Sequence, residues 1–215
     1  MKKLLASSVI AATAFAGVAA PAMADLSANV GYASEYYYRG FLQKESSASA
    51  GLDFEQAGFY AGTWTADVGD GLEVDVYGGY GMEFGDFSVG AGFTGYYYTG
   101  EFDDTYEEIN LNLGWKFLSV GYSVGEYANF DGPTVDYDYV EVTAEHNGFY
   151  ATYGDFGDEA EGSHFKFGYG TEVGGFDLGI EAIFSDDKAS DQNDSNGEPT
   201  ESEALIFSLS KSFDL

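Results

Sequence analysis

The stretch Phe87-Ser-Val-Gly-Ala-Gly-Phe-Thr-Gly-Tyr96 alternates between apolar residues and small or polar residues. The same period of two returns at 118–124, at 176–182 and at 205–213. Alternate side chains of a β-strand point to opposite faces of its sheet. Each stretch is therefore predicted to be a strand with one apolar face and one face of small and polar side chains.

The position of the apolar face separates two fold classes. In a soluble sandwich it points into a core, whereas in a membrane barrel it points to lipid and the polar face lines the lumen. The chain holds 18% aromatic residues and 30 glycines but three prolines, a composition that favours strands. Most strand-like segments are near the roughly 9–11 residues that a tilted strand needs to cross a bilayer. The twelve segments run 26–42, 47–56, 59–68, 72–82, 87–98, 105–115, 117–127, 137–146, 149–156, 164–171, 176–186 and 203–213.

The connections between these segments alternate in length. Tight connections lie at Ala57-Gly58, 83–86, Lys116, Asn147-Gly148 and 172–175, and longer, more acidic ones lie at 99–104, 128–136, 157–163 and 187–202. Asn-Gly between apolar runs is a strong signal for a two-residue hairpin turn. Short turns at one end and longer loops at the other are typical of outer-membrane barrels. We therefore predict an all-β fold: a transmembrane antiparallel up-and-down barrel of about 12 strands, with short periplasmic turns and longer acidic outer loops.

The N-terminus has the features of a secretory signal peptide. A basic Met-Lys-Lys start precedes an apolar stretch at 4–18, and Ala22-Met-Ala24 fits a cleavage site. We predict that residues 1–24 are cleaved and that residues 25–215 form a barrel in the cell outer membrane. A retained membrane helix is the alternative, which the short apolar stretch disfavours because a spanning helix needs about 20 apolar residues.

Charge and cysteine content narrow the range of partners. Residues 25–215 carry 6 Lys and Arg against 37 Asp and Glu, a net charge of −31. Such a chain repels nucleic acid, which is therefore not expected as a partner. There is no cysteine, so neither a disulfide framework nor a thiolate metal site is expected, and no cofactor is predicted. The expected partners are outer-membrane lipid, lipopolysaccharide and small solutes, cations foremost; the oligomeric state is left open.

The last segment and the tyrosine clusters fit a membrane barrel. Phe213, on an apolar strand face near the C-terminus, resembles the signal read by the bacterial barrel-assembly machinery. Tyr36, Tyr38 and Tyr97 belong to two Tyr-Tyr-Tyr runs at the predicted outer rim, where a ring lies in lipid and its hydroxyl stays wet. We predict all four as interface aromatics, with the middle tyrosine of each run pointing away from the side of its neighbours. Ordinary aromatic packing at a sheet end is the alternative.

Four blocks of sequence resemble one known family. They are Asn29–Gly40 with its Tyr-Tyr-Tyr-Arg-Gly ending, Gly58-Phe-Tyr-Ala-Gly-Thr-Trp64, Glu73-Val-Asp-Val-Tyr-Gly-Gly-Tyr80 and Ser208-Leu-Ser-Lys-Ser-Phe213. Together they are similar to the TorF family of porins, over essentially the whole of residues 25–215. The resemblance implies an outer-membrane barrel with a transport role and supplies no substrate. The acidic stretch at 186–203 departs from the family pattern.

The lumen face follows if the apolar face is turned toward lipid. Carboxylates dominate it, so a water-filled bore would favour cations over anions. Its polar residues are Glu35, Arg39, Asp53, Glu55, Asp67, Glu73, Asp75, Glu108, Asn110, Asn112, Glu141, Glu145, Lys166, Asp177 and Glu181. Twelve strands enclose less space than the 16–18 strands of large porins, so the pore is expected to be narrow. Arg39 is predicted as a constriction or bracing residue, while pairing of Arg39 and Lys166 with carboxylates, which would plug the bore, is the alternative.

No metal site is predicted. Asp194, Asn196, Gly197 and Glu203 match four positions of a calcium-loop pattern, but Gln192 stands at the first position. Such a match is expected by chance in a stretch rich in Asp and Asn. A solvated, repulsive loop is therefore expected, with loose bridging of divalent cations to lipopolysaccharide phosphates as the alternative.

The chain is predicted not to be an enzyme. Its two histidines, His146 and His164, lie at opposite predicted ends of the barrel. Ser163 precedes His164, but neighbouring strand residues face opposite sides and cannot act as a nucleophile and its base. Neither a G-x-S-x-G elbow nor an H-E-x-x-H helix occurs in the sequence.

Three functions remain. The leading hypothesis is an outer-membrane, porin-like channel for passive diffusion of small solutes, narrow and cation-preferring. The alternative is a non-conducting outer-membrane barrel with a structural or surface-interaction role. A soluble periplasmic β-sandwich is the third interpretation, which the alternating loop lengths disfavour.

Overall fold

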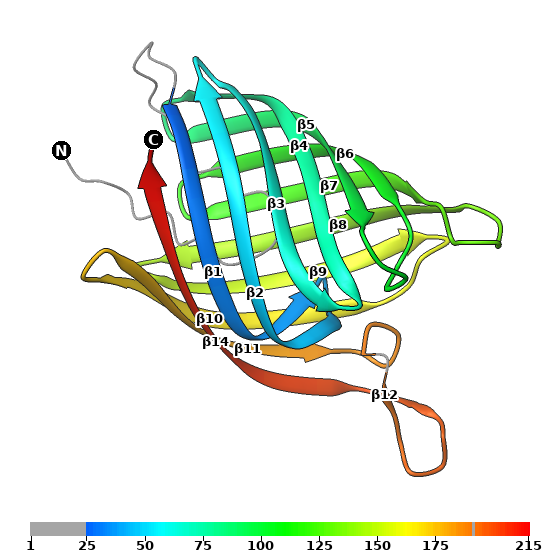
Figure 1. The fold of residues 1–215 in the computed structure, drawn as a ribbon. Coiled ribbons are helices and arrows are strands. Elements are labelled where there is room, and N and C mark those ends of the chain that lie inside the picture. Colours follow the sequence, from blue (N-terminus) through cyan, green and yellow to red (C-terminus); the bar gives the residue numbers. More distant parts are fainter. Residues whose placement is uncertain (1–24, 191) are drawn as a thin grey trace.

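The computed structural model describes residues 25–190 and 192–215 and folds them into a closed β-barrel (Figure 1). The predicted signal peptide, residues 1–24, lies outside the described residues. Within the described part of the chain, twelve strands form the barrel. They are β1 (Asp25–Tyr38), β2 (Phe41–Gln56), β3 (Phe59–Gly69), β4 (Gly71–Phe84), β5 (Phe87–Tyr98), β6 (Tyr106–Trp115), β7 (Leu118–Tyr127), β8 (Val135–His146), β9 (Phe149–Asp158), β10 (Ser163–Val173), β11 (Phe176–Ser185) and β14 (Ser202–Asp214).

The barrel closes through its first and last strands. Each strand pairs antiparallel with the strand that precedes or follows it in the barrel, and β14 pairs antiparallel with β1. The closing register runs from Ser27 opposite Asp214 to Ala33 opposite Ser208. The prediction of a twelve-stranded, antiparallel, all-β barrel is confirmed.

No helix in the described residues is long and apolar enough to cross a membrane.

The outer face of the barrel is a belt of exposed apolar side chains. Phe93 on β5, Leu111 on β6, Val124 on β7 and Phe207 on β14 are each at least half exposed. Soluble proteins rarely expose an apolar surface of this extent, and spanning barrels turn such a surface to lipid. The strands are therefore treated as membrane-spanning.

Short turns gather at one end of the barrel, here called the turn end. They are Ala57-Gly58, Gly85-Asp86, Lys116-Phe117, Asn147-Gly148 and Gly174-Gly175. Asn147 and Gly148 both have positive φ, 54° and 83°, as a two-residue hairpin turn requires. The opposite end, here called the loop end, carries the long connections at 99–105, 128–134, 159–162 and 186–201. The chain end at Leu215 lies at the turn end, where its backbone N–H donates to the Leu26 carbonyl (Figure 1).

The first two connections at the loop end differ from the prediction. The sequence pattern suggested strands at 26–42 and 47–56, but the chain turns at Arg39-Gly40. Both turn residues have positive φ, 46° and 102°. The sequence pattern did not indicate this turn, because the apolar residues on each side of Arg39-Gly40 resemble one continuous strand. The connection between β3 and β4 is Asp70 alone, so long loops begin only after β5.

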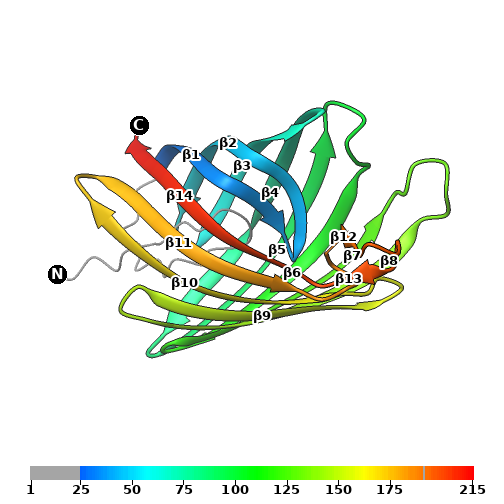
Figure 2. The ribbon, with the colours of Figure 1, turned by 90° about the horizontal axis from the view of Figure 1, so that it is seen from below.

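The loop after β11 contains a small separate sheet, made of β12 (Gln192–Asn193) and β13 (Pro199–Thr200), which are labelled in Figure 2. Asp194 closes this hairpin, because its Oδ1 accepts the backbone N–H groups of Asn196 at 2.7 Å and Glu198 at 3.0 Å. The carboxylate that fitted the calcium pattern is therefore engaged with its own turn. Among the described residues, no group of three or more His, Cys, Asp or Glu could hold a metal ion.

Candidate functional site in the barrel lumen

The end of the β1–β2 hairpin leaves the barrel wall. β1 pairs with β14 only as far as Ala33, and β2 pairs with β3 only from Ser49 onward. Residues 34–48 therefore form ladder pairs only within the β1–β2 hairpin, where Ser47 and Ala48 pair with Ala33 and Tyr32, and a register shift lies between Tyr36 and Tyr37. Such a bulge bends a strand. Figure 2 shows this end of the hairpin turning into the barrel interior. Residues 34–48 are called the inner hairpin below.

The two faces of the inner hairpin contact different parts of the wall. Tyr36 packs with Ala66 of β3. Tyr37 packs with Ile183 of β11 and Ile206 of β14. All five side chains are buried. The inner hairpin therefore occupies the lumen between β3 on one side and β11 and β14 on the other.

Arg39, at the turn of the inner hairpin, reaches the far wall. Its Nη1 and Nη2 donate to Glu108 Oε2 at 2.9 Å and Oε1 at 2.8 Å, and Nη2 also donates to Ser123 Oγ at 3.2 Å. The guanidinium carbon lies 4.2 Å from the centre of the Tyr139 ring. Arg39 is 5% exposed. A bidentate, charge-assisted pair in a dry environment is among the stronger polar contacts in proteins.

Glu108 accepts further hydrogen bonds from the wall. Tyr96 Oη donates at 2.9 Å, Tyr137 Oη at 3.0 Å and Asn110 Nδ2 at 2.7 Å. These donors come from β5, β8 and β6. The Glu108 carboxylate therefore keeps neutral donors that are independent of Arg39.

A second pair of carboxylates lies on β4. Glu73 is fully buried and accepts from Tyr36 Oη at 2.5 Å and from Tyr98 Oη at 3.1 Å. Asp75 is 9% exposed, and its Oδ1 has no hydrogen-bond partner among the described residues. The two side chains share one strand face because they are two residues apart. The hydroxyl of Tyr36 thus ties the inner hairpin to an acidic part of the wall.

The inner face is wetter toward the turn end. Glu55 and Glu145 are exposed, and Asp53, Glu141 and Asp177 are partly exposed. Water therefore reaches the carboxylates at this end of the barrel. The loop-end half, by contrast, is filled by the inner hairpin.

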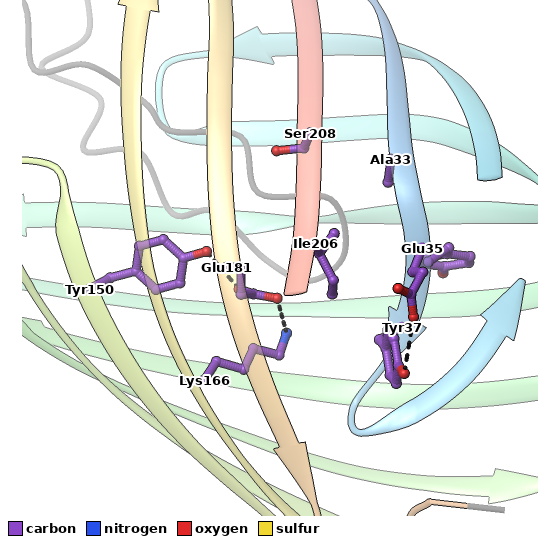
Figure 3. A pocket seen from close by; sticks show the side chains of 9 residues that line it. Ala33, Glu35, Tyr37, Tyr150, Lys166, Glu181, Ile206 and Ser208 are labelled. Atoms are coloured by element: carbon purple, nitrogen blue, oxygen red, sulfur yellow. Dashed lines mark hydrogen bonds and ion pairs between the residues drawn. The ribbon is translucent and has the colours of Figure 1, made fainter. Parts of the chain in front are cut away.

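A pocket lies in the lumen beside the inner hairpin (Figure 3). Its empty volume is about 380 Å³, open solvent at its mouth included. Lys166 Nζ lies 4.0 Å from Glu181 Oε1, and Tyr150 Oη donates to Glu181 Oε2 at 2.6 Å. The pocket brings together Glu35, Lys166 and Glu181, three of the residues predicted for the lumen face. The full lining is Ala33, Glu35, Tyr36, Tyr37, Tyr150, Lys166, Glu181, Ile206 and Ser208.

The predicted lumen residues thus fall into groups. Arg39 and Glu108 pair directly, Glu73 and Asp75 lie side by side on β4, and the pocket holds a third group. The remaining carboxylates lie toward the turn end. Whether they line an open path stays a prediction. Asp67 is a correction: it alternates with the buried Ala66 and therefore lies on the opposite face of β3, where it pairs with Lys44.

Of the four predicted interface aromatics, two lie on the barrel surface and two lie in its interior. Tyr97 and Phe213 are exposed on the barrel. Tyr36 is instead buried against Glu73, and the Tyr38 ring packs edge-on against Tyr96 with 5.3 Å between ring centres. The placement of these two tyrosines corrects the expectation of lipid contact. Both tyrosines belong to the part of the inner hairpin that lies inside the barrel, so their side chains meet protein and not lipid.

The apolar contacts of the inner hairpin were not among the predicted site residues. Ile183 and Ile206 lie on the inward face, and each is followed in its strand by an outward phenylalanine, Phe184 and Phe207. The sequence carries a signal for them, because Ala182-Ile-Phe184 and Leu205-Ile-Phe207 are apolar on both faces. An apolar residue on the inward face of a barrel strand breaks the alternation, and it indicates that an apolar side chain packs against that strand within the lumen.

The loop after β11 covers the inner hairpin. Ser185 Oγ donates to the Gly40 carbonyl at 2.6 Å. A Cβ atom at Gly40 would lie 3.0 Å from the Cβ of Ala189, which is fully buried. Only glycine therefore fits here, and the positive φ of 102° adds to the requirement. The loop and the turn of the inner hairpin are in direct contact.

Asp186 anchors the same loop. Its carboxylate accepts the backbone N–H of Ala189 at 2.9 Å and both the backbone N–H and the hydroxyl of Ser163 at 2.8 Å. Partial burial acts to raise the pKa of Asp186, but the hydrogen bonds from the Ala189 and Lys188 N–H groups and from Ser163 outweigh it, and the pKa is lowered. Ser163 thus donates its hydroxyl to Asp186.

Sequence comparison places the chain in a family. The model of a family described as "Bacterial protein of unknown function (Gcw_chp)" matches residues 16–213. The chain belongs to the Gcw_chp family. No curated protein matches its sequence significantly. The resemblance to the TorF family stays a prediction, because the description of the Gcw_chp family names no activity.

Solved structures share the architecture of this Gcw_chp protein at low sequence identity. One chain, described under "Unveiling the Mechanism Behind the in-meso Crystallization of Membrane Proteins", is 9% identical with a TM-score of 0.59, covering 89% of this chain and 84% of that chain. The NanC porin is 15% identical with a TM-score of 0.50, covering 88% of this chain and 100% of the porin. Pseudomonas aeruginosa OprD is 14% identical with a TM-score of 0.43, covering 89% of this chain and 67% of OprD. The first two likenesses show a shared fold, and the second of them is the fold of a porin.

Proposed function

We propose that this Gcw_chp protein is an outer-membrane, porin-like channel for passive diffusion of small solutes, with a narrow and cation-preferring bore. One observation carries the proposal: a closed barrel that is apolar outside has exposed carboxylates on its inner face at the turn end. Charged groups in water inside a lipid-facing wall are what an aqueous passage needs. The porin-type fold supports the same proposal.

The preference for cations follows from the charges of the inner face. Glu55 and Glu145 stand in water and form no ion pair within the described part of the chain, whereas Arg39 and Lys166 each lie beside a glutamate. The uncompensated charge along the path is therefore negative. Fixed negative charge lowers the energy of a passing cation and raises that of an anion.

A non-conducting barrel is the second candidate. The inner hairpin fills the loop-end half of the lumen, and acidic loops surround it. A permanently filled barrel would serve a structural or surface-interaction role. The two candidates differ in conductance.

Conductance in a planar bilayer under a KCl gradient tests the channel. We expect small openings, and a reversal potential of the current that indicates cation preference. Replacing Glu55 and Glu145 by glutamine should lower the cation preference by roughly two- to fivefold, because a charge about 4 Å from an ion in water is worth about 1 kcal/mol. Absence of conductance from the folded barrel, both unchanged and with Arg39→Ala, would favour the non-conducting candidate.

The matched control is Glu107→Gln. Glu107 is exposed and alternates with the inward Glu108, so it lies on the outer face of β6. The Glu107→Gln substitution removes one negative charge from the outside of the barrel, and it is compared with Glu55→Gln and Glu145→Gln made singly. An equal loss of preference in this control would refute a selectivity set by the inner face.

A further inference from the structure

The inner hairpin closes the loop-end half of the barrel, and we infer that it is a displaceable plug whose latch is Arg39. Displacing the tip of the hairpin would open the passage, which makes Arg39 its constriction residue. This inference rests on the proposed channel function, but its test does not depend on conductance.

The plug is surrounded by buried side chains from most of the wall. A water-filled bore would leave such inward residues wet, whereas a plug excludes water from them. Eight consecutive strands, β4 to β11, contribute at least one of these buried residues: Glu73, Tyr96, Glu108, Ser123, Tyr139, Thr152, His164 and Ile183. The lumen at the inner hairpin is therefore closed by protein.

The attachment of the plug permits it to move as a unit. Residues 34–48 form ladder pairs only within the β1–β2 hairpin and none with β3 or β14. The ladder pairs among residues 35–45 would be retained if the hairpin moved, because both partners of each pair lie inside it. The ladder to β14 ends at Ala33 and the ladder to β3 begins at Ser49, which places a hinge at the base of the hairpin.

The contacts that hold the tip are mostly made by side chains. Arg39 binds Glu108 and Ser123, Ser185 Oγ binds the Gly40 carbonyl, and the Phe41 ring packs edge-on against Phe156 with 5.9 Å between ring centres. Contacts of this kind break and reform without disturbing the barrel ladder. Local openings of this sort are the normal way in which poorly laddered segments move.

Arg39 is the latch because it carries the ion pair at the tip. When the tip of the hairpin moves away from Glu108, the Arg39 guanidinium would enter water, so its charge would not stay buried without a partner. Glu108 would keep its bonds from Tyr96 and Tyr137. The cost of opening is thereby limited, because neither partner is left buried without hydrogen bonds.

Thiol labelling tests the plug. The chain has no cysteine, so Ser123→Cys supplies a single thiol directly under Arg39. A membrane-impermeant maleimide should label it slowly in the otherwise unchanged barrel. In the Arg39→Ala background labelling should become about tenfold faster, since losing even one hydrogen bond to a charged group shifts a local opening by roughly that factor.

The matched control is Ser119→Cys on the same strand and the same face. Ser119 is exposed and lies four residues toward the turn end. It should label rapidly both in the otherwise unchanged barrel and in the Arg39→Ala background. Equal labelling of both thiols in the unchanged barrel would overturn the plug. Slow labelling of Ser123→Cys that Arg39→Ala does not accelerate would overturn the latch.

The labelling result is interpreted only for variants that fold, and it is independent of whether the barrel conducts. Heat-dependent gel migration shows whether each variant is a folded barrel, and Arg39→Lys serves if Arg39→Ala does not fold. Lysine keeps the charge but not the bidentate geometry, so it should accelerate labelling less than alanine. A latch that passes the labelling test in a barrel without conductance would leave the plug standing and refute only the channel.

Discussion

At the scale of single residues, buried carboxylates explain why tyrosines gather inside this barrel. Glu73 is fully buried and forms no ion pair with any described residue, yet two tyrosine hydroxyls donate to it. Hydrogen bonds to a charged group stabilise it more than neutral bonds do. The lumen thus uses phenol groups where a soluble core would use arginine or exclude the acid.

This arrangement predicts the effect of Tyr36→Phe. The variant removes the 2.5 Å bond to Glu73 and leaves a buried carboxylate with one fewer donor. We expect the free energy of unfolding to fall by about 1.5–3 kcal/mol. Urea unfolding in micelles, followed by gel migration, measures it.

Tyr32→Phe is the control for this prediction. Tyr32 lies on the same strand, and its exposed hydroxyl shares a hydrogen bond with Ser46. Losing this bond between two neutral hydroxyls leaves no buried acid without a donor, so it should cost less, about 0.5–1.5 kcal/mol. Equal effects from the two variants would show that the Glu73 contact contributes nothing of its own.

At the scale of elements, the strands follow from local pattern and the inner hairpin does not. The alternation of apolar and polar residues predicted most strand ends within two residues. It could do so because each strand carries its lipid-facing residues at every second position. Residues 34–48 instead contact β3, β6 and β11, which lie far from them in sequence. The periodicity of a strand cannot show whether a hairpin stays in the barrel wall or folds into the lumen, because side chains buried by protein on both faces give no alternating pattern.

The loop that covers the hairpin is expected to loosen in acid. The pKa of Asp186 is lowered in the folded loop, against an ordinary value of about 3.9. Its anchoring is therefore fully present above about pH 3.9 and is lost as the pH falls through the lower folded value. Amide hydrogen exchange at residues 187–190, corrected for the intrinsic effect of pH, should accelerate in that range.

Two variants separate this anchor from general effects of acid. Asp186→Asn should show fast exchange in the loop already at pH 7, since a neutral amide cannot accept all four of the charge-assisted bonds. Asp187→Asn removes the neighbouring, exposed carboxylate and should leave exchange unchanged. Protection that survives in Asp186→Asn would rule out the anchor.

At the scale of the whole molecule, the distribution of apolar and polar side chains is the reverse of that in a soluble domain. Many of the exposed side chains of the barrel are apolar, and many of its buried side chains are polar. Alternating faces and the grouping of long loops at one end were enough to predict this arrangement, because both are properties of consecutive residues. The filled lumen could not be predicted in the same way, since it depends on where one hairpin folds against the finished wall.

Arginine on the outer face tests the membrane-spanning assignment. Leu111 lies near the middle of β6 and is 50% exposed. Leu111→Arg should lower the free energy of unfolding in phospholipid vesicles by about 2–4 kcal/mol, the cost of an arginine facing the bilayer centre. Phe130→Arg places the same charge in the loop at 128–134, where Phe130 is already exposed, and should change little. Urea unfolding followed by the fluorescence of Trp64 and Trp115 measures both variants. If the two substitutions cost the same, the exposed apolar belt does not face lipid, and the channel proposal loses its basis.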